Sequence, residues 1–317
     1  MRRQSWLHRL ASVVLIVVGL IAIAVLPTDT LTPSGTTPTA TAGDPASTSA
    51  VLVGAGDIAR CSTTGDEETA ALLEGIEGTV FTTGDNAYSD GTTDDFASCY
   101  EPSWGRLMAR TRPSPGNHDY HTPGGDGYYG YFGATAGPAG LGYYAYDLGD
   151  WRIYALNSNC DDPAVDCNAQ LAWLQNDLAS EPRACVAAYW HHPRFSSGRH
   201  GGHSYVQPLW ETLHAAGAEL ILNGHDHDYE RFAPMDPRGA LDVDYGLREF
   251  VVGTGGAGLR DFLATEANSE VRSSDTHGVL RLDLRSDGYA WSFIPVSGTF
   301  SDTGSGACHG SPAASTP

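Results

Sequence analysis

Residues 80–88 read VFTTGDNAY, an apolar run that ends at a Gly-Asp-Asn turn. β-branched and aromatic residues favour a buried strand, and Gly followed by Asp and Asn favours a tight turn. The same pattern, a strand-like run that ends in a turn crowded with Asp, Asn or His, recurs in VLVGAGDIA (51–59), RPSPGNHDY (112–120), AAYWHHPRF (187–195) and LILNGHDHDYER (220–231).

The rest of the chain predicts a layered α/β fold. Compact apolar runs predict strands at 51–55, 79–83, 186–190 and 219–222, and helical spacing of apolar residues predicts helices at 67–76, 94–110, 169–180 and 206–216. Residues 143–157 and 277–296 each have two strand-like halves around a turn, which predicts hairpins and a mixed sheet. We expect one domain over 51–308, a mixed β-sandwich flanked by helices.

The polar turns are expected to lie close together. In α/β sheets, ligands bind beyond the carboxyl ends of the strands, so the five turns meet if their strands are neighbours. Eight of the twelve histidines fall within 118–121, 191–203 and 225–227, which is too concentrated for scattered surface histidines. Oxygen donors from Asp and Asn together with imidazoles suit Zn, Fe and Mn, and a carboxylate can bridge two such ions.

Both ends of the chain have their own composition. Basic residues followed by the apolar run from Ala11 to Leu26 predict a signal peptide over 1–26, with an uncleaved N-terminal anchor as the alternative. Residues 27–50, rich in Thr, Ser and Pro, predict a disordered linker, and 309–317 a similar tail. We therefore expect a secreted protein, in contact with a membrane only if the N-terminal segment is retained.

The net charge and the cysteine content further narrow the range of possible functions. The formal net charge of −20 argues against nucleic acid as a stable partner, because cationic groups must neutralise its phosphates. The six cysteines are even in number and, after export, form disulfides by default, although many pairings remain open. Cys160 and Cys167 form the easiest local pair, and Cys61 with Cys99 and Cys185 with Cys308 is the guess for the others.

The ordered motifs GD, GDNAY, GNHD, HHP and GHDH resemble those of the calcineurin-like metallophosphoesterases, and more narrowly the purple acid phosphatases. The general family usually has GDxH at the first motif, whereas residues 56–59 read GDIA, so that His ligand is missing. Purple acid phosphatases use a tyrosine three residues after the bridging aspartate instead, and Tyr88 stands three residues after Asp85. The resemblance spans about residues 51–300.

The resemblance implies two metal ions and assigns their ligands. The first ion, implied to be ferric iron, would be held by Asp57, Asp85, Tyr88 and His227. The second, implied to be Fe, Zn or Mn, would be held by Asp85, Asn117, His191 and His225, with Asp85 bridging.

Two further histidines receive catalytic roles from the resemblance. His118 would face the ester oxygen as general acid or phosphate ligand, and His200 would lie beside the phosphate. His192 and His203 have no clear counterpart and are given no role. The chain departs from the plant members at Asp119, where they have Glu, and in lacking their N-terminal β-sandwich domain.

These features together predict an exported, metal-dependent phosphoric ester hydrolase of the acid phosphatase type. Phosphomonoesters, cleaved by a metal-bound hydroxide, are the leading substrates, and the oligomeric state is left open. The alternatives are a phosphodiesterase or nucleotidase with the same site, and a non-catalytic secreted binding protein on the same scaffold. A serine hydrolase is disfavoured because the chain has no GxSxG sequence. Two glycine patterns, GAGDIA and GTGGAG, are interpreted as loops rather than dinucleotide sites.

Overall fold

The computed structural model describes residues 49–310 of the 317. The predicted signal peptide or anchor, the linker up to residue 48 and the tail from residue 311 lie outside the described residues. The described residues belong to one compact unit, 45–317. No helix within 49–310 is both long enough and apolar enough to cross a membrane.

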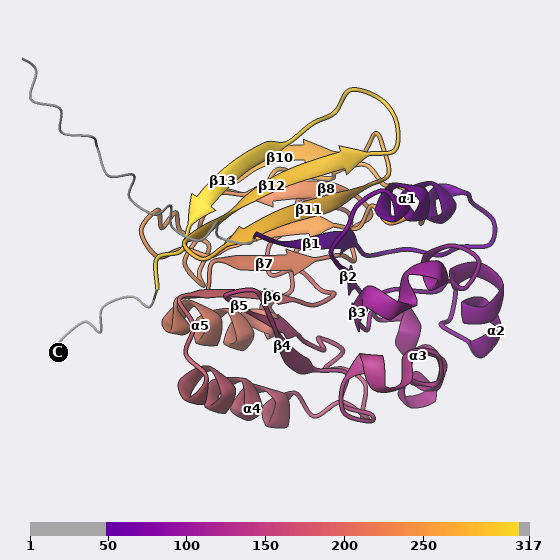
Figure 1. The fold of residues 1–317 in the computed structure, drawn as a ribbon, viewed down its shortest axis with the longest axis horizontal. Coiled ribbons are helices and arrows are strands. Elements are labelled where there is room, and N and C mark those ends of the chain that lie inside the picture. Colours follow the sequence, from indigo (N-terminus) through magenta and orange to yellow (C-terminus); the bar gives the residue numbers. More distant parts are fainter. Residues whose placement is uncertain (1–48, 311–317) are drawn as a thin grey trace, which may run out of the picture. The chain divides into compact units, whose positions relative to one another are not determined.

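The first of two β-sheets has six strands (Figure 1). In order across the sheet they are β13 (Thr303–Ala307), β12 (Gly288–Pro295), β11 (Gly278–Arg285), β1 (Ala50–Ala55), β2 (Thr79–Thr83) and β3 (Thr111–Ser114). Strands β1, β2 and β3 are parallel, and the other pairings are antiparallel. The predicted hairpin over 277–296 is confirmed as β11 and β12.

The second sheet has seven strands. In order they are β10 (Ser269–Ser273), β8 (Tyr229–Phe232), β9 (Arg248–Val252), β7 (Leu220–Asn223), β6 (Cys185–Tyr189), β5 (Trp151–Ala155) and β4 (Tyr144–Leu148). The central strands β9, β7, β6 and β5 are parallel, and the strands outside them pair antiparallel. The predicted hairpin over 143–157 is confirmed as β4 and β5.

Aromatic side chains join the two sheets face to face. The rings of Phe81 and Tyr189 lie 5.7 Å apart and those of Tyr229 and Phe293 4.4 Å apart, and each pair links one sheet to the other. These rings belong to a large apolar core that contains residues of both sheets. Burying that apolar surface is the main contribution to the stability of the sandwich.

Helices cover the outer faces of the sandwich. Helix α1 (Gly65–Glu74) buries Ala70 and Leu73 in the core of the first sheet. Helices α4 (Cys167–Ser180) and α5 (Gln207–Ala216) lie along the second sheet and share a separate apolar cluster with β6 and β7 (Figure 1). The predicted fold class, a mixed α/β sandwich flanked by helices, is confirmed.

The single helix predicted over 94–110 is wrong. The segment folds as a short helix α2 (Thr93–Asp95), a π-helical turn η1 (Phe96–Tyr100) and a 3-10 helix η2 (Trp104–Arg110). Pro102 lacks a backbone N–H and Ser103 is non-helical, which separates η1 from η2. The helices predicted at 67–76, 169–180 and 206–216 are confirmed with small shifts of their ends as α1, α4 and α5.

Several short helices connect the strands. They are η3 (His118–Tyr120), η4 (Pro123–Gly125), α3 (Asp126–Phe132), η5 (Gly133–Ala136) and η6 (Ser204–Val206).

Disulfides tie three parts of the unit together. Cys61 pairs with Cys99, Cys160 with Cys167 and Cys185 with Cys308, so the guessed pairing is confirmed. The last bond joins β6 to the residue that follows β13, and so connects the C-terminal strand of one sheet to the centre of the other.

Glu219 lies at the same junction, 2% exposed. Its carboxylate accepts the N–H groups of Val186, 2.7 Å away, and His309, 3.2 Å away. Burial raises the pKa of Glu219 to about 7, although these hydrogen bonds oppose the shift. The folded protein therefore binds this proton more tightly than the unfolded chain does.

This shift predicts a pH dependence of stability. The contribution of Glu219 is fully present below the unfolded pKa near 4.5 and is lost as the pH rises through about 7. Glu219→Gln removes this titration. We therefore expect the free energy of unfolding of the variant minus that of the wild type to rise by about 3 kcal/mol between pH 4.5 and 8. Urea titrations of both proteins across this range measure the difference. A difference that does not change with pH would contradict the prediction.

Candidate metal centre

All five polar turns meet at the ends of their strands, but the strands lie in two sheets rather than side by side in one. Asp57, Asp85 and Asn117 follow β1, β2 and β3 of the first sheet. His191 and His225 follow β6 and β7 of the second. Each sheet of the predicted sandwich contributes one group of adjacent parallel strands, and the packing of the two sheets brings the carboxyl ends of both groups together.

Four predicted ligands form a first donor group. The Tyr88 hydroxyl lies 2.8 Å from Asp57 Oδ1, 2.9 Å from Asp85 Oδ2 and 3.1 Å from His227 Nε2. His227 Nε2 is also 3.3 Å from Asp57 Oδ1. All four side chains are buried. Their donor atoms therefore surround one small volume.

A second donor group surrounds His191 Nε2. This nitrogen lies 3.0 Å from Asn117 Oδ1, 3.1 Å from His225 Nδ1 and 3.4 Å from Asp85 Oδ2. Asp85 Oδ2 belongs to both groups, because it also contacts the Tyr88 hydroxyl. The arrangement thus has one shared carboxylate oxygen between two sets of donors.

Backbone contacts orient the donor side chains. The Nδ1 atoms of His191 and His227 bond the carbonyl oxygens of Thr83 and Gly258, each at 2.8 Å, which leaves both Nε2 atoms facing the cluster. Asp85 Oδ1 accepts the N–H of His118 at 2.8 Å, which directs Oδ2 inward. Such partners fix the tautomer and orientation of metal ligands.

The backbone is unusual at three of the donors. Asp57, Asp85 and His225 have φ values of 57°, 51° and 73°, a left-handed region that non-glycine residues seldom adopt. Such strain concentrates at functional sites, where the surrounding structure compensates for it. Gly224 allows the close approach, since a Cβ there would lie 2.5 Å from Asp57 Oδ2.

The electrostatics of the cluster call for positive charge. Burial alone would raise the pKa of Asp85, but His191 and His118 hold it well below its usual value. Burial likewise would lower the pKa of His191, yet Asp85 raises it to about 9. A proton on His191 Nε2 can hydrogen-bond only some of its acceptor neighbours at once. A cation at the centre of each group would interact with all of them. The donor set therefore fits two metal ions.

Tyr88 gives the same indication. Burial and the Asp57 and Asp85 carboxylates raise the pKa of Tyr88 well above its usual value. The phenol therefore keeps its proton unless a cation neutralises these carboxylates. A tyrosinate at this position requires a strongly charged ion.

The two predicted catalytic histidines border the cluster. His118 Nδ1 bonds the carbonyl of Ser89 at 2.5 Å, and its Nε2 lies 3.8 Å from Asp85 Oδ2. The ring of His200 lies 4.5 Å from that of His225, and its Nε2 accepts a hydrogen bond from Arg260. Burial, with a smaller effect of Arg260, lowers the pKa of His200, so this imidazole is neutral near pH 7.

Sequence reasoning gave no role to His192 and His203, which also lie at the site. Their rings are 4.5 Å and 5.0 Å from the ring of His225. His191, His192 and His225 each offer a ring nitrogen within 4.8 Å of the other two. The second His of the HHP motif was a sequence signal that could have pointed to His192. No sequence signal pointed to the contact between Arg260 and His200, because that contact depends on long-range packing.

Buried carboxylates hold the loop that carries His200 and His203. Asp226 accepts the N–H groups of His200 and Gly201 at 2.7 and 3.1 Å. Glu230 accepts the N–H of Ser197 at 2.7 Å. Glu249 accepts the N–H of Arg194 at 2.9 Å. The buried hydroxyls of Ser196 and Ser197 also donate to Asp226 and Glu230, so the loop is fixed through its main chain and these two serines.

The chain matches the model of the calcineurin-like phosphoesterase family over residues 53–229, and it belongs to that family. The predicted enzyme class, a metal-dependent phosphoric ester hydrolase, agrees with this membership.

Within the curated proteins the chain is similar to purple acid phosphatases. It is 25% identical over 228 residues to purple acid phosphatase 15 of Arabidopsis thaliana, covering 58% of this chain and 41% of that protein. It is 29% identical over 230 residues to purple acid phosphatase 21 of the same plant, covering 62% and 51%. The chain thus spans about half the length, or less, of these relatives. The narrower resemblance seen in the motifs is confirmed.

Solved structures share the fold. The purple acid phosphatase PPD1 from yellow lupin seeds superposes with a TM-score of 0.61 at 18% identity, covering 81% of this chain and 54% of that one. GAP50, described as the anchor in the inner membrane complex of Plasmodium, superposes with a TM-score of 0.63 at 15% identity, covering 84% and 90%. Because an anchor protein has this fold too, the chemistry has to be argued from the donors.

The shared oxygen leads to a prediction about metal content. Purified wild-type protein should contain about two metal ions per chain, as a two-metal site requires. Asp85→Ala should lose both ions, because it removes the one donor common to both groups. Asp90→Ala, which removes an exposed carboxylate nearby, should keep them. Elemental analysis measures the content, and an Asp85→Ala protein that still holds both ions would refute the shared-ligand geometry.

Proposed function

We propose that the protein is an exported phosphomonoesterase with a dinuclear metal centre. The observation that carries this proposal is Asp85 Oδ2, which lies 2.9 Å from the Tyr88 hydroxyl and 3.4 Å from His191 Nε2. Two metal ions bound at such a site lower the pKa of water, so that it attacks near neutral pH, and stabilise charge on both the attacking and leaving oxygens.

The ligand assignment follows from the two donor groups. Ferric iron in the first group would be held by Asp57, Asp85, Tyr88 and His227. Fe, Zn or Mn in the second group would be held by Asp85, Asn117, His191 and His225.

His118 would supply the proton for the leaving group. Its Nδ1 is engaged by the Ser89 carbonyl, so Nε2 is the atom that can reach the ester. Hydrolysis breaks the bond from phosphorus to the alcohol oxygen and forms one to the oxygen of water. The leaving alkoxide takes a proton from His118, and a proton from the water restores the histidine.

His200 and Arg260 would contact the phosphate. The Arg260 guanidinium donates a hydrogen bond to His200, which orients that ring. A guanidinium suits the non-bridging oxygens of a phosphate, which carry negative charge. The pair would therefore hold the phosphate of the substrate.

Export is supported by the targeting segment in the sequence and by the disulfides. All six cysteines are paired, and disulfides persist in oxidising compartments. A non-catalytic binding protein on this scaffold is disfavoured, because every donor of both groups is present in a buried cluster.

The proposal predicts hydrolysis of p-nitrophenyl phosphate that depends on His118. His118→Gln should lower kcat by about a hundredfold, in the range of general acid–base catalysis, with the metal content unchanged. Steady-state kinetics and elemental analysis of the same preparations test this. His214→Gln, at a histidine paired with Asp242 far along α5, serves as the control. Metal-loaded wild-type protein that does not cleave this ester would refute the proposed function, and cleavage of bis-p-nitrophenyl phosphate alone would indicate a phosphodiesterase instead.

Tyr88 predicts the identity of the first ion. Tyrosinate bound to ferric iron gives a visible charge-transfer band, so the wild-type protein should be coloured and Tyr88→Phe colourless. An absorption spectrum of each protein measures this. A colourless, active wild-type protein would exclude ferric iron and leave Zn or Mn.

A further inference from the structure

A polar hollow of about 250 Å³ opens beside the second donor group. Asn117, His192, Tyr205, Asp161 and Asp162 all line it. We call Asn117 and the buried His192 its inner end and the other three its outer part. Asn117 is itself 3.0 Å from His191 Nε2, so the hollow begins at the metal donors. A substrate whose phosphate lies on the metals would extend its alcohol into this space.

The inner end of the hollow offers an unused ring nitrogen. His192 is 7% exposed, and its Nδ1 lies 2.8 Å from the Ser158 hydroxyl. Ser158 also accepts the backbone N–H of His192, at 3.1 Å, so the serine hydroxyl holds this histidine through both its backbone and its Nδ1. No residue within 49–310 bonds the other ring nitrogen, Nε2. This buried ring nitrogen is therefore available to hydrogen-bond a group that enters the hollow.

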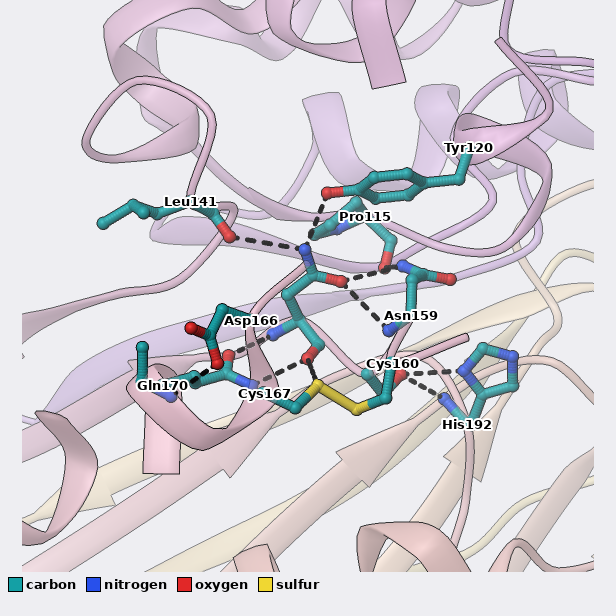
Figure 2. The surroundings of a disulfide bond; sticks show 12 residues. Pro115, Tyr120, Leu141, Asn159, Cys160, Asp166, Cys167, Gln170 and His192 are labelled. Atoms are coloured by element: carbon teal, nitrogen blue, oxygen red, sulfur yellow. Dashed lines mark hydrogen bonds between the residues drawn. A yellow bond between two sulfur atoms is a disulfide. The ribbon is translucent and has the colours of Figure 1, made fainter. Parts of the chain in front are cut away.

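Hydrogen bonds and a disulfide support the backbone next to the outer wall, and Figure 2 shows the surroundings of that disulfide. Asn157 exchanges two hydrogen bonds with Gln170, at 2.7 and 2.8 Å, and bonds the Tyr120 hydroxyl at 2.8 Å. The disulfide between Cys160 and Cys167 closes the loop that carries Asp161. A wall fixed in this way contributes to binding without an ordering cost.

The charge of the wall is negative. Among the described residues that line the hollow there are two aspartates and no lysine or arginine. Asp162 accepts the N–H of Ala164 at 2.8 Å, whereas no hydrogen bond or ion pair within 49–310 engages the Asp161 carboxylate. Asp161 and Tyr205 line the same hollow, and burial together with Asp161 raises the pKa of Tyr205 well above its usual value.

Tyr205 adds an aromatic surface beside this charge. It is 38% exposed, one of the few large apolar side chains at the surface of the described chain. A cation over a tyrosine ring is attracted by the ring face, and a carboxylate nearby reinforces that attraction. An anion would meet repulsion from the same wall.

We propose that this hollow receives the leaving alcohol and selects phosphate monoesters of small alcohols that carry a positively charged amine. The inference rests on the proposed phosphomonoesterase function. His192 Nε2 would hydrogen-bond the ester at the inner end, and Asp161 and Tyr205 would face the cation at the outer end. The hollow is smaller than usual small-molecule sites, which favours compact alcohols.

The test compares two esters of one shape, choline phosphate and its uncharged carbon analogue 3,3-dimethylbutyl phosphate. Asp161→Asn should lower the ratio of kcat/KM for choline phosphate to kcat/KM for the uncharged analogue by about fivefold, as expected for one partly exposed charge pair. The change in ratio between proteins cancels the intrinsic reactivity of each ester. Asp150→Asn, at an exposed carboxylate on the turn between β4 and β5, removes the same charge and should leave the ratio unchanged.

Further arms make the outcome specific. Phosphoglycolate, whose alcohol carries a carboxylate, should be cleaved faster by Asp161→Asn than by wild type. Tyr205→Leu should lower the choline ratio, and Tyr205→Phe should keep it. An unchanged ratio in Asp161→Asn, or wild-type protein that cleaves p-nitrophenyl phosphate but not choline phosphate, would overturn the subsite. Failure on every ester would instead refute the phosphomonoesterase proposal.

Discussion

One carboxylate oxygen, Asp85 Oδ2, imposes the strongest constraint on the molecule. It has to lie within reach of Tyr88 from its own sheet and of His191 from the other sheet. This requires the two sheets to pack face to face with the carboxyl ends of β1 to β3 level with those of β6 and β7. The aromatic contacts between the sheets and the Cys185–Cys308 bond keep that alignment. The cluster gathers so many acceptors in one buried place that only cations balance it.

Local features of the sequence predicted much of this structure. Apolar runs located the strands, and the turn residues after them located every donor, because each signal lies within a few residues of the position it describes. The even number of cysteines predicted that they form disulfides. The family resemblance grouped Tyr88 with Asp57 and His227, and its hydroxyl lies beside both side chains.

Most of what the sequence analysis missed depends on contacts between distant segments, and one miss had a local cause. Sheet membership of the five strands follows from pairing partners such as β11 with β1, which lie over 200 residues apart. The break in 94–110 follows from Pro102, a local signal that helical spacing overrode. Packing between distant segments, which local sequence patterns do not reveal, determines the remaining features. These are the location of His203, the contact of Arg260 with His200 and the carboxylates under the loop.

The loop over residues 194–201 is held mainly by its own N–H groups, which Asp226, Glu230 and Glu249 accept. Every amino acid except proline supplies that group, so the course of the loop tolerates many replacements of its outward side chains. Substrate range can therefore diverge by point mutation while the ligands beneath remain untouched. Such a scaffold, in which the loop can change its side chains while the catalytic centre stays the same, is well suited to the evolution of new ester preferences.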